Sequence, residues 1–194
     1  MSAATVEAGR GTPYRVLRAI GRRWPAGLAL VMSVPMAGGA DVAGQVSGLG
    51  EVLLLLPMLY LVTARTGRRG LSWPLLAAAF GLIFAVRGLD LVPAPFLLVP
   101  LGAALLVWSV VGGHAHRGGV RIQALGLVGF SALALLGLAL DPDVGLYVVA
   151  AGWLLHGVWD FVHLRLDRVV ARSYAEWCGV VDILVAAQLL ALAW

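Results

Sequence analysis

The sequence contains no lysine, a single cysteine and few charged residues of any kind. Charged side chains make up 12% of its 194 residues, against about one quarter in ordinary soluble domains. All fourteen basic residues are arginines. Because Cys178 has no partner cysteine, the chain can form no internal disulfide, and cysteine usage does not define its redox compartment. The shortage of charge excludes an ordinary cytosolic domain.

Long apolar runs take the place of the missing charge. Hydrophobic residues make up 61% of the chain, and they form runs of about 17–21 residues, the length that a helix needs to cross a bilayer. We predict an all-α, polytopic membrane protein with seven transmembrane helices, joined by short connectors that make consecutive helices antiparallel neighbours. The predicted spans are 24–43, 48–64, 71–89, 92–112, 122–140, 144–163 and 175–194.

The arginines predict the orientation of these spans. Thirteen of the fourteen lie in the N-terminal tail or in the connectors 65–70, 114–121 and 164–172, and Arg87 alone lies on the other side. Basic residues are retained on the cytoplasmic side of a membrane. The N-terminus is therefore expected in the cytoplasm and the C-terminus outside. This placement also explains the net charge of +4 without a nucleic-acid partner.

The basic tail over 1–23 is expected to be distinct from the seven-helix domain over 24–194. Its segment YRVLRAIGRRW places apolar residues and arginines on different helical sides, which is typical of a helix lying on a membrane surface. The expected partners are membrane lipids, with the anionic inner leaflet bound by the tail arginines. A basic tail that only fixes topology, or a cleaved secretory signal, fits the same residues. No oligomeric state follows from the sequence.

The stretch HGVWDFVH places three ionisable residues inside the sixth predicted span. His156, Asp160 and His163 fall within an arc of about 60° on one helical face. A charged group inside a span costs roughly 2.5–3.5 kcal/mol on insertion scales, so this stripe is expected to face the bundle interior and to be functional.

The seventh span carries a matching stripe of Tyr174, Cys178 and Asp182. Since the two spans run in opposite directions, His156 and Asp182 are both expected on the order of 11–12 Å from the inner boundary. The two stripes are therefore predicted to face each other. The candidate site consists of His156, Asp160, Asp182, His163, Cys178 and Tyr174.

Nitrogen and carboxylate ligands in this pattern suit zinc, iron or manganese. Because His156 and His163 lie roughly 10 Å apart along the helix, the predicted metal ligands are His156, Asp160 and Asp182, with zinc or iron as the candidate ion. Without a metal, the same groups form an acid/base pair or a proton relay. As a third interpretation, they are a polar clamp between the two helices.

These interpretations correspond to three functions. The first is a metal or acid/base centre that acts on a lipid or isoprenoid substrate. The second is a proton-coupled carrier of small molecules, although the chain has no evident internal repeat of the kind found in many transporters. The third is a structural or assembly subunit. On the outer side, Arg87 is expected to form an ion pair with Glu51 or Asp41, near Asp90.

The segments GWLLHGVWDFVH and SYAEWCGVVD resemble a group of small uncharacterised bacterial integral membrane proteins. That group has an H-x3-D-x2-H helix followed by a helix with tyrosine, cysteine and aspartate. The resemblance covers 152–190, and Leu164 and Ala175 stand where the group often has histidine and proline. It implies a location in a bacterial cytoplasmic (inner) membrane and no activity. More loosely, the chain is similar to seven-helix zinc hydrolases of the ceramidase and adiponectin-receptor type.

Overall fold

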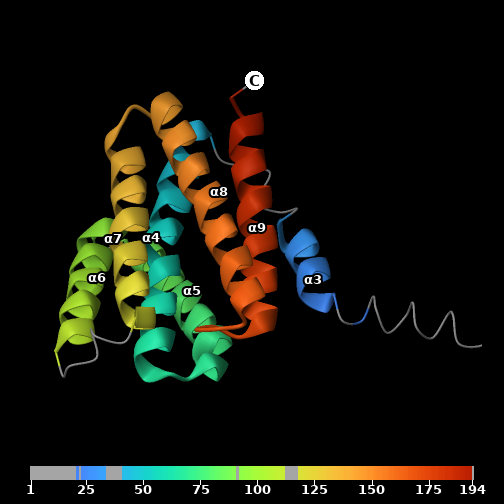
Figure 1. Ribbon diagram of the computed structural model, residues 1–194. Coiled ribbons are helices and arrows are strands. Elements are labelled where there is room, and N and C mark those ends of the chain that lie inside the picture. Colours follow the sequence, from blue (N-terminus) through green and yellow to red (C-terminus); the bar gives the residue numbers. More distant parts are fainter. Residues whose placement is uncertain (1–20, 22, 34–40, 91, 112–117, 194) are drawn as a thin grey trace, which may run out of the picture.

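The computed structural model is an all-α bundle that describes residues 21, 23–33, 41–90, 92–111 and 118–193 (Figure 1). Within these residues the chain forms seven α-helices and the short 3₁₀ helix η2 (Arg69–Leu71). The α-helices are α3 (Trp24–Ser33), α4 (Val42–Thr66), α5 (Ser72–Leu89), α6 (Ala94–Val110), α7 (Gly118–Ala139), α8 (Pro142–Leu166) and α9 (Arg172–Ala191). The predicted surface helix over 1–23 lies almost entirely outside the described residues.

Five segments are long and apolar enough to cross a membrane: α4, α5 together with η2, α7, α8 and α9. The prediction of a multi-pass membrane protein is therefore confirmed. In the described residues α3 and α6 are apolar but shorter, at 10 and 17 residues. The predicted spans 24–43 and 92–112 continue into residues that are not described, so the count of seven spans stays a prediction.

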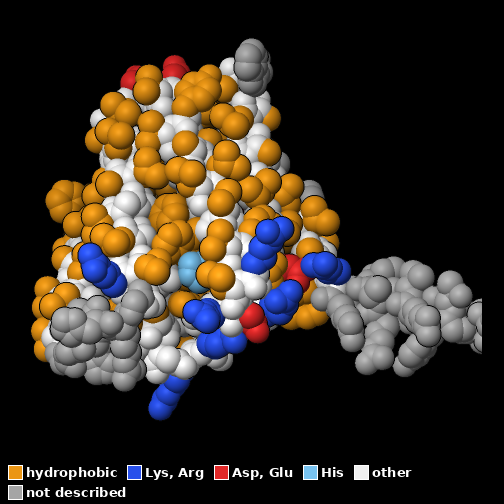
Figure 2. Space-filling view, viewed as in Figure 1, with side chains coloured by type: hydrophobic (Ala, Val, Ile, Leu, Met, Phe, Trp, Pro, Cys, Tyr) orange, Lys and Arg blue, Asp and Glu red, His pale blue; other side chains and the backbone are white. Residues whose placement is uncertain are grey.

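The outer surface of the bundle is apolar, and its charge lies at the ends. Phe84 on α5 and Phe96 on α6 are 71% and 75% exposed, as expected for side chains that face lipid rather than water. Eight of the nine described arginines lie where α3, α5, α7 and α9 begin or where α4 and α8 end. We call this the arginine-rich end, and Figure 2 shows several of these side chains gathered there.

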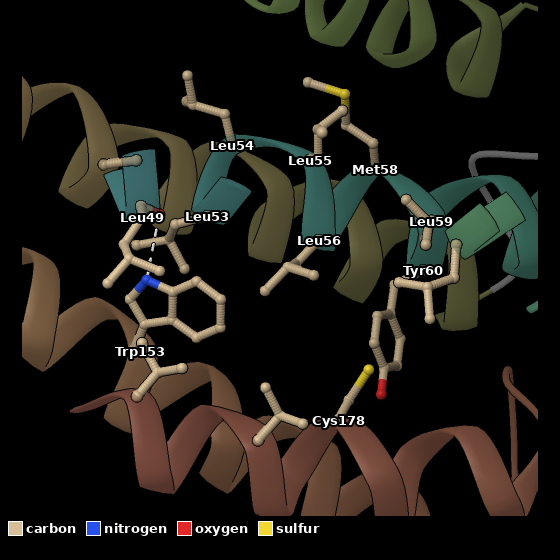
Figure 3. Close-up of a cluster of buried hydrophobic side chains, with 14 of the residues drawn as sticks. Leu49, Leu53, Leu54, Leu55, Leu56, Met58, Leu59, Tyr60, Trp153 and Cys178 are labelled. Atoms are coloured by element: carbon tan, nitrogen blue, oxygen red, sulfur yellow. Dashed lines mark hydrogen bonds between the residues drawn. The ribbon is translucent and has the colours of Figure 1, made fainter. Parts of the chain in front are cut away.

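The central element is α4, which packs against α5, α6, α7 and α8. Its Leu49, Leu53 and Leu56 lie toward α8 and α9, while Leu54 and Met58 point to the other side (Figure 3). Trp153 of α8 donates its indole N–H to the Leu49 carbonyl oxygen at 3.1 Å. The helix is thus apolar on most of its faces because most of its sides are buried.

Consecutive helices are not always neighbours. The helix α3 packs against α9, and α5 and α6 make little contact with each other. The expectation that sequential helices pair is therefore wrong for these elements. A short connector holds only the ends of two helices together. Which helix faces pack against each other depends on where the small and polar residues lie.

Local signals define the ends of α4 and α8. Asp41 caps α4 by accepting a hydrogen bond from the Gly44 N–H at 2.9 Å, and Gly67 ends it in the left-handed conformation at φ 67°. Asp141 and Pro142 begin α8, as expected for a capping carboxylate followed by proline in the first turn. The helix α8 begins close to the start of the predicted span 144–163, whereas α4 begins earlier than the predicted span 48–64.

The expected ion pair of Arg87 is confirmed with Glu51. The Arg87 Nε donates to Glu51 Oε2 at 2.8 Å, and Glu51 is buried on α4. The guanidinium lies over Gly48, where a β-carbon would come within 3.4 Å of it. Because Gly48 has no side chain, the guanidinium has room to cross α4 at this point. An arginine near the end of α5 can therefore pair with a carboxylate inside the bundle.

Candidate functional site

Two glycines bring α8 and α9 close together at the level of the candidate site. A β-carbon on Gly157 would lie 3.1 Å from the Asp182 β-carbon, and one on Gly179 would lie 3.1 Å from the Phe161 ring. A larger residue at either position would push the helices apart. The close approach is what allows the short side chains of α8 to reach those of α9.

His156 lies between two buried carboxylates. Its Nδ1 is 2.7 Å from Asp182 Oδ2 on α9 and 3.5 Å from Asp160 Oδ2, one turn further along α8. Ligand atoms of these three residues lie within 4.8 Å of one another. The prediction that His156 and Asp182 face each other is therefore confirmed, and Asp160 lies with them in one buried group.

Tyr60 joins the group from a third helix. Its hydroxyl donates to Asp160 Oδ1, and its ring contacts those of His156 and His163 edge-on. It also points toward Cys178 across the space between α4 and α9 (Figure 3). The sequence places Tyr60 only as an aromatic residue near a span end, because no polar stripe accompanies it on α4.

His163 lies outside the three-residue group. Its Nδ1 donates to the Trp159 carbonyl oxygen at 2.9 Å, and its Nε2 accepts from the Gln123 amide at 2.9 Å. Both ring nitrogens are thus used, which leaves the imidazole neutral and without a free lone pair for a metal. The expectation that His163 is not among the metal ligands agrees with this arrangement.

Tyr174 and Cys178 line the α9 side of the site, and both are buried. The Tyr174 hydroxyl has no nitrogen or oxygen partner among the described residues, and its ring packs edge-on against Tyr60 and Trp73. Cys178 is a free thiol. Neither belongs to the group whose ligand atoms converge. A catalytic role for either residue stays a prediction.

The charge of the site is unbalanced within the described residues. A protonated His156 between two carboxylates leaves one net negative charge, and no arginine forms an ion pair with Asp160 or Asp182 in the described ranges. A buried charge without a counter-charge is costly. The site reaches neutrality with one additional proton, or with a divalent cation and a neutral imidazole.

An apolar cavity of about 400 Å³ reaches the site. It lies between α3, α4, α5, α8 and α9, and Asp182 is the one charged residue among the described residues that line it. Leu56, Trp153 and Cys178 border the space between α4 and α9 that Figure 3 shows. A titratable group at the wall of an apolar pocket is the usual arrangement of a ligand or substrate site.

Comparisons with models of protein families, with curated proteins and with solved structures return no significant match. The resemblance to the group with the H-x3-D-x2-H helix therefore rests on residue spacing alone. What the structure adds is the membrane-length helices and the buried His156, Asp160 and Asp182. The chemistry of the site has to be argued from these contacts.

Proposed function

We propose that this membrane protein holds a divalent transition metal, zinc or iron, at His156, Asp160 and Asp182 and uses it to act on a lipid or isoprenoid substrate. The observation that carries the proposal is the convergence of three ligand atoms within 4.8 Å, one of which belongs to Asp182 at the wall of an apolar cavity. We further propose that the arginine-rich end faces the cytoplasm, because arginine excess marks the cytoplasmic side.

The donor set fits such a metal. One imidazole nitrogen and two carboxylate oxygens suit zinc or iron and leave a coordination position for substrate or water. Ligand atoms on bonds of about 2.0–2.1 Å around a tetrahedral ion lie roughly 3.3–3.5 Å apart. The His156–Asp160 distance of 3.5 Å meets this spacing, and the His156–Asp182 distance of 2.7 Å requires a small separation of the two side chains.

Each side chain has a distinct part in this proposal. A bound divalent metal supplies Lewis acidity, which polarises a carbonyl or phosphoryl oxygen or lowers the pKa of water. His156 and Asp182 hold it at the crossing of α8 and α9, and Asp160 is oriented by the Tyr60 hydroxyl. The apolar cavity excludes water from the reacting group, which strengthens electrostatic interactions within it.

Elemental analysis of the full chain in mild detergent tests the metal. We expect near one equivalent of zinc or iron per chain, and less than about one tenth of that in His156→Ala and in Asp182→Asn. The matched control is His163→Ala, which removes a histidine of the same helix and should keep the metal. Wild-type protein that is folded by circular dichroism yet neither contains zinc or iron nor takes them up would overturn the proposal.

Tyr60→Phe is expected to weaken the metal site without removing a ligand. The substitution deletes the donor to Asp160 Oδ1, and loss of such an orienting hydrogen bond typically lowers metal affinity about 10–100-fold. Competition of a chelator for zinc measures this affinity. Tyr174→Phe makes the same chemical change next to the site and should shift the affinity less than threefold. Equal affinity in wild type and Tyr60→Phe would contradict a role in orienting Asp160.

A proton-coupled carrier is the second candidate, and one observation favours it. Tyr60, Asp160, His156 and Asp182 form a continuous series of polar contacts across three helices, as a proton relay requires. In that case vesicles containing metal-free protein would show proton-linked flux that is lost in Asp182→Asn. If the flux is lost when the metal binds, these residues are instead assigned to the metal centre.

A further inference from the structure

The cavity beside Asp182 opens sideways toward the hydrocarbon layer. Phe84 and Met32 belong to its lining and are 71% and 46% exposed, whereas Leu56 and Trp153 at its inner walls are buried. Its mouth therefore lies between α3 and α5, away from the arginine-rich end, where Trp24 at the start of α3 stacks on Trp73 at the start of α5. The space leads from the lipid-facing surface to the candidate site.

The depth of the cavity corresponds to acyl chains rather than headgroups. At 1.5 Å per residue, Asp182 lies about 15 Å along α9 from its start at the arginine-rich end, and Phe84 about 18 Å along α5. The hydrocarbon core of a bilayer is about 30 Å thick. The mouth and the polar wall are thus both near the middle of the hydrocarbon core.

The charge of the lining excludes a lipid headgroup. Among the described residues that line the cavity none is basic, so they offer no counter-charge to a phosphate, and Asp182 repels an anion. Water is excluded as the main occupant as well, because a water molecule needs two to four polar partners that this lining does not supply. A volume of about 400 Å³ is within the usual range for a small-molecule site.

We propose that the cavity binds one acyl chain of a bilayer lipid, which enters between α3 and α5 and lies against Asp182 and Cys178. This deepens the proposed function and rests on it only for the substrate class: the cavity holds the hydrocarbon part of the lipid on which the metal centre acts. Acyl chains are the molecules that meet the mouth at the highest concentration in a bilayer, which favours them over an isoprenoid.

Photochemical cross-linking of the full chain in phospholipid vesicles tests this assignment. The probes are a phosphatidylglycerol with a diazirine at mid-chain, the same lipid with a headgroup diazirine, and a diazirine-labelled isoprenoid alcohol. We expect the mid-chain probe to label peptides bearing Phe80 and Cys178, with at least fivefold less labelling by either other probe. Excess unlabelled phospholipid should compete.

Cavity filling provides the matched comparison. Val52→Trp places a large ring in the lining and should lower mid-chain labelling of these peptides at least fivefold, whereas Val107→Trp on the exposed face of α6 should leave it unchanged. Asp182→Asn should retain the labelling even though it abolishes metal binding, which separates this inference from the metal proposal. Labelling confined to outward-facing residues of wild type, or stronger labelling by the isoprenoid probe, would overturn it.

Discussion

Replacing His156 with alanine is expected to lower the free energy of unfolding by about 3–5 kcal/mol. The substitution leaves Asp160 and Asp182 facing each other without the imidazole between them, and both are almost fully buried. Removal of one partner from a buried charged group typically costs this much, because the remaining charge is uncompensated. Reversible unfolding in detergent micelles, followed by circular dichroism, measures the change.

The triple variant His156→Ala, Asp160→Asn, Asp182→Asn separates charge from packing. It has the same cavity as the single variant but no carboxylate charge, and the amide introduced in place of Asp160 retains an acceptor oxygen for the Tyr60 hydroxyl. We therefore expect it to regain more than half of the lost stability. If the triple variant is as unstable as His156→Ala, buried charge is not the cause, and packing of the imidazole against Phe130 accounts for the loss.

The same comparison distinguishes a functional site from a clamp. If the charged residues are only a clamp, their role is to stabilise the packing of α8 against α9. Buried ion pairs can often be replaced by neutral groups with little loss of folding free energy, so charge is not required for such a role. Stability near that of wild type in the triple variant, together with loss of metal, would show that α8 and α9 do not need these charges in order to pack. The charged residues would then be retained for their chemistry.

The pairing of the last two helices could be predicted from the sequence, for a simple physical reason. Ionisable groups are costly in hydrocarbon, so polar residues at matching depth on consecutive antiparallel spans have to face one another. His156 and Asp182 meet this condition, and the structure brings them to 2.7 Å. The pair of Arg87 with Glu51 follows from the same argument.

Tyr60 and Gln123 illustrate what could not be predicted. Neither lies in a stripe of acidic residues and histidines such as that of α8, so nothing in the sequence marks the face it occupies. The role of Tyr60 depends on α4 lying next to α8, and hydropathy gives no information about which non-consecutive helices pack. Gln123 lies on α7, directly before α8, and an isolated amide gives no sign of which residue on the next helix it will contact. The central position of α4 could not be predicted from hydropathy either, because every span in this chain is apolar.

The largest packing effect is expected at the crossing of α7 and α8. A β-carbon on Gly145 would lie 2.3 Å from the carbonyl oxygen of Gly137, and the facing β-carbon on Gly137 would lie 2.6 Å from a Val149 methyl group. Backbone atoms cannot move aside as a flexible side chain does. Gly145→Ala therefore forces the two helices apart, and we expect a loss of at least about 3 kcal/mol, at the upper end of the range for overpacking.

Gly129→Ala on α7 is the matched control for this substitution. A β-carbon at Gly129 would meet nothing within 4 Å, so the same chemical change should leave stability unchanged or raise it by up to about 1 kcal/mol through helix propensity. Unfolding of both variants in one detergent gives the difference directly. Equal stability would mean that α7 and α8 do not cross at these glycines. Because α8 carries His156 and Asp160, a shift of α8 at Gly145 should also lower the metal content, which Gly129→Ala should preserve.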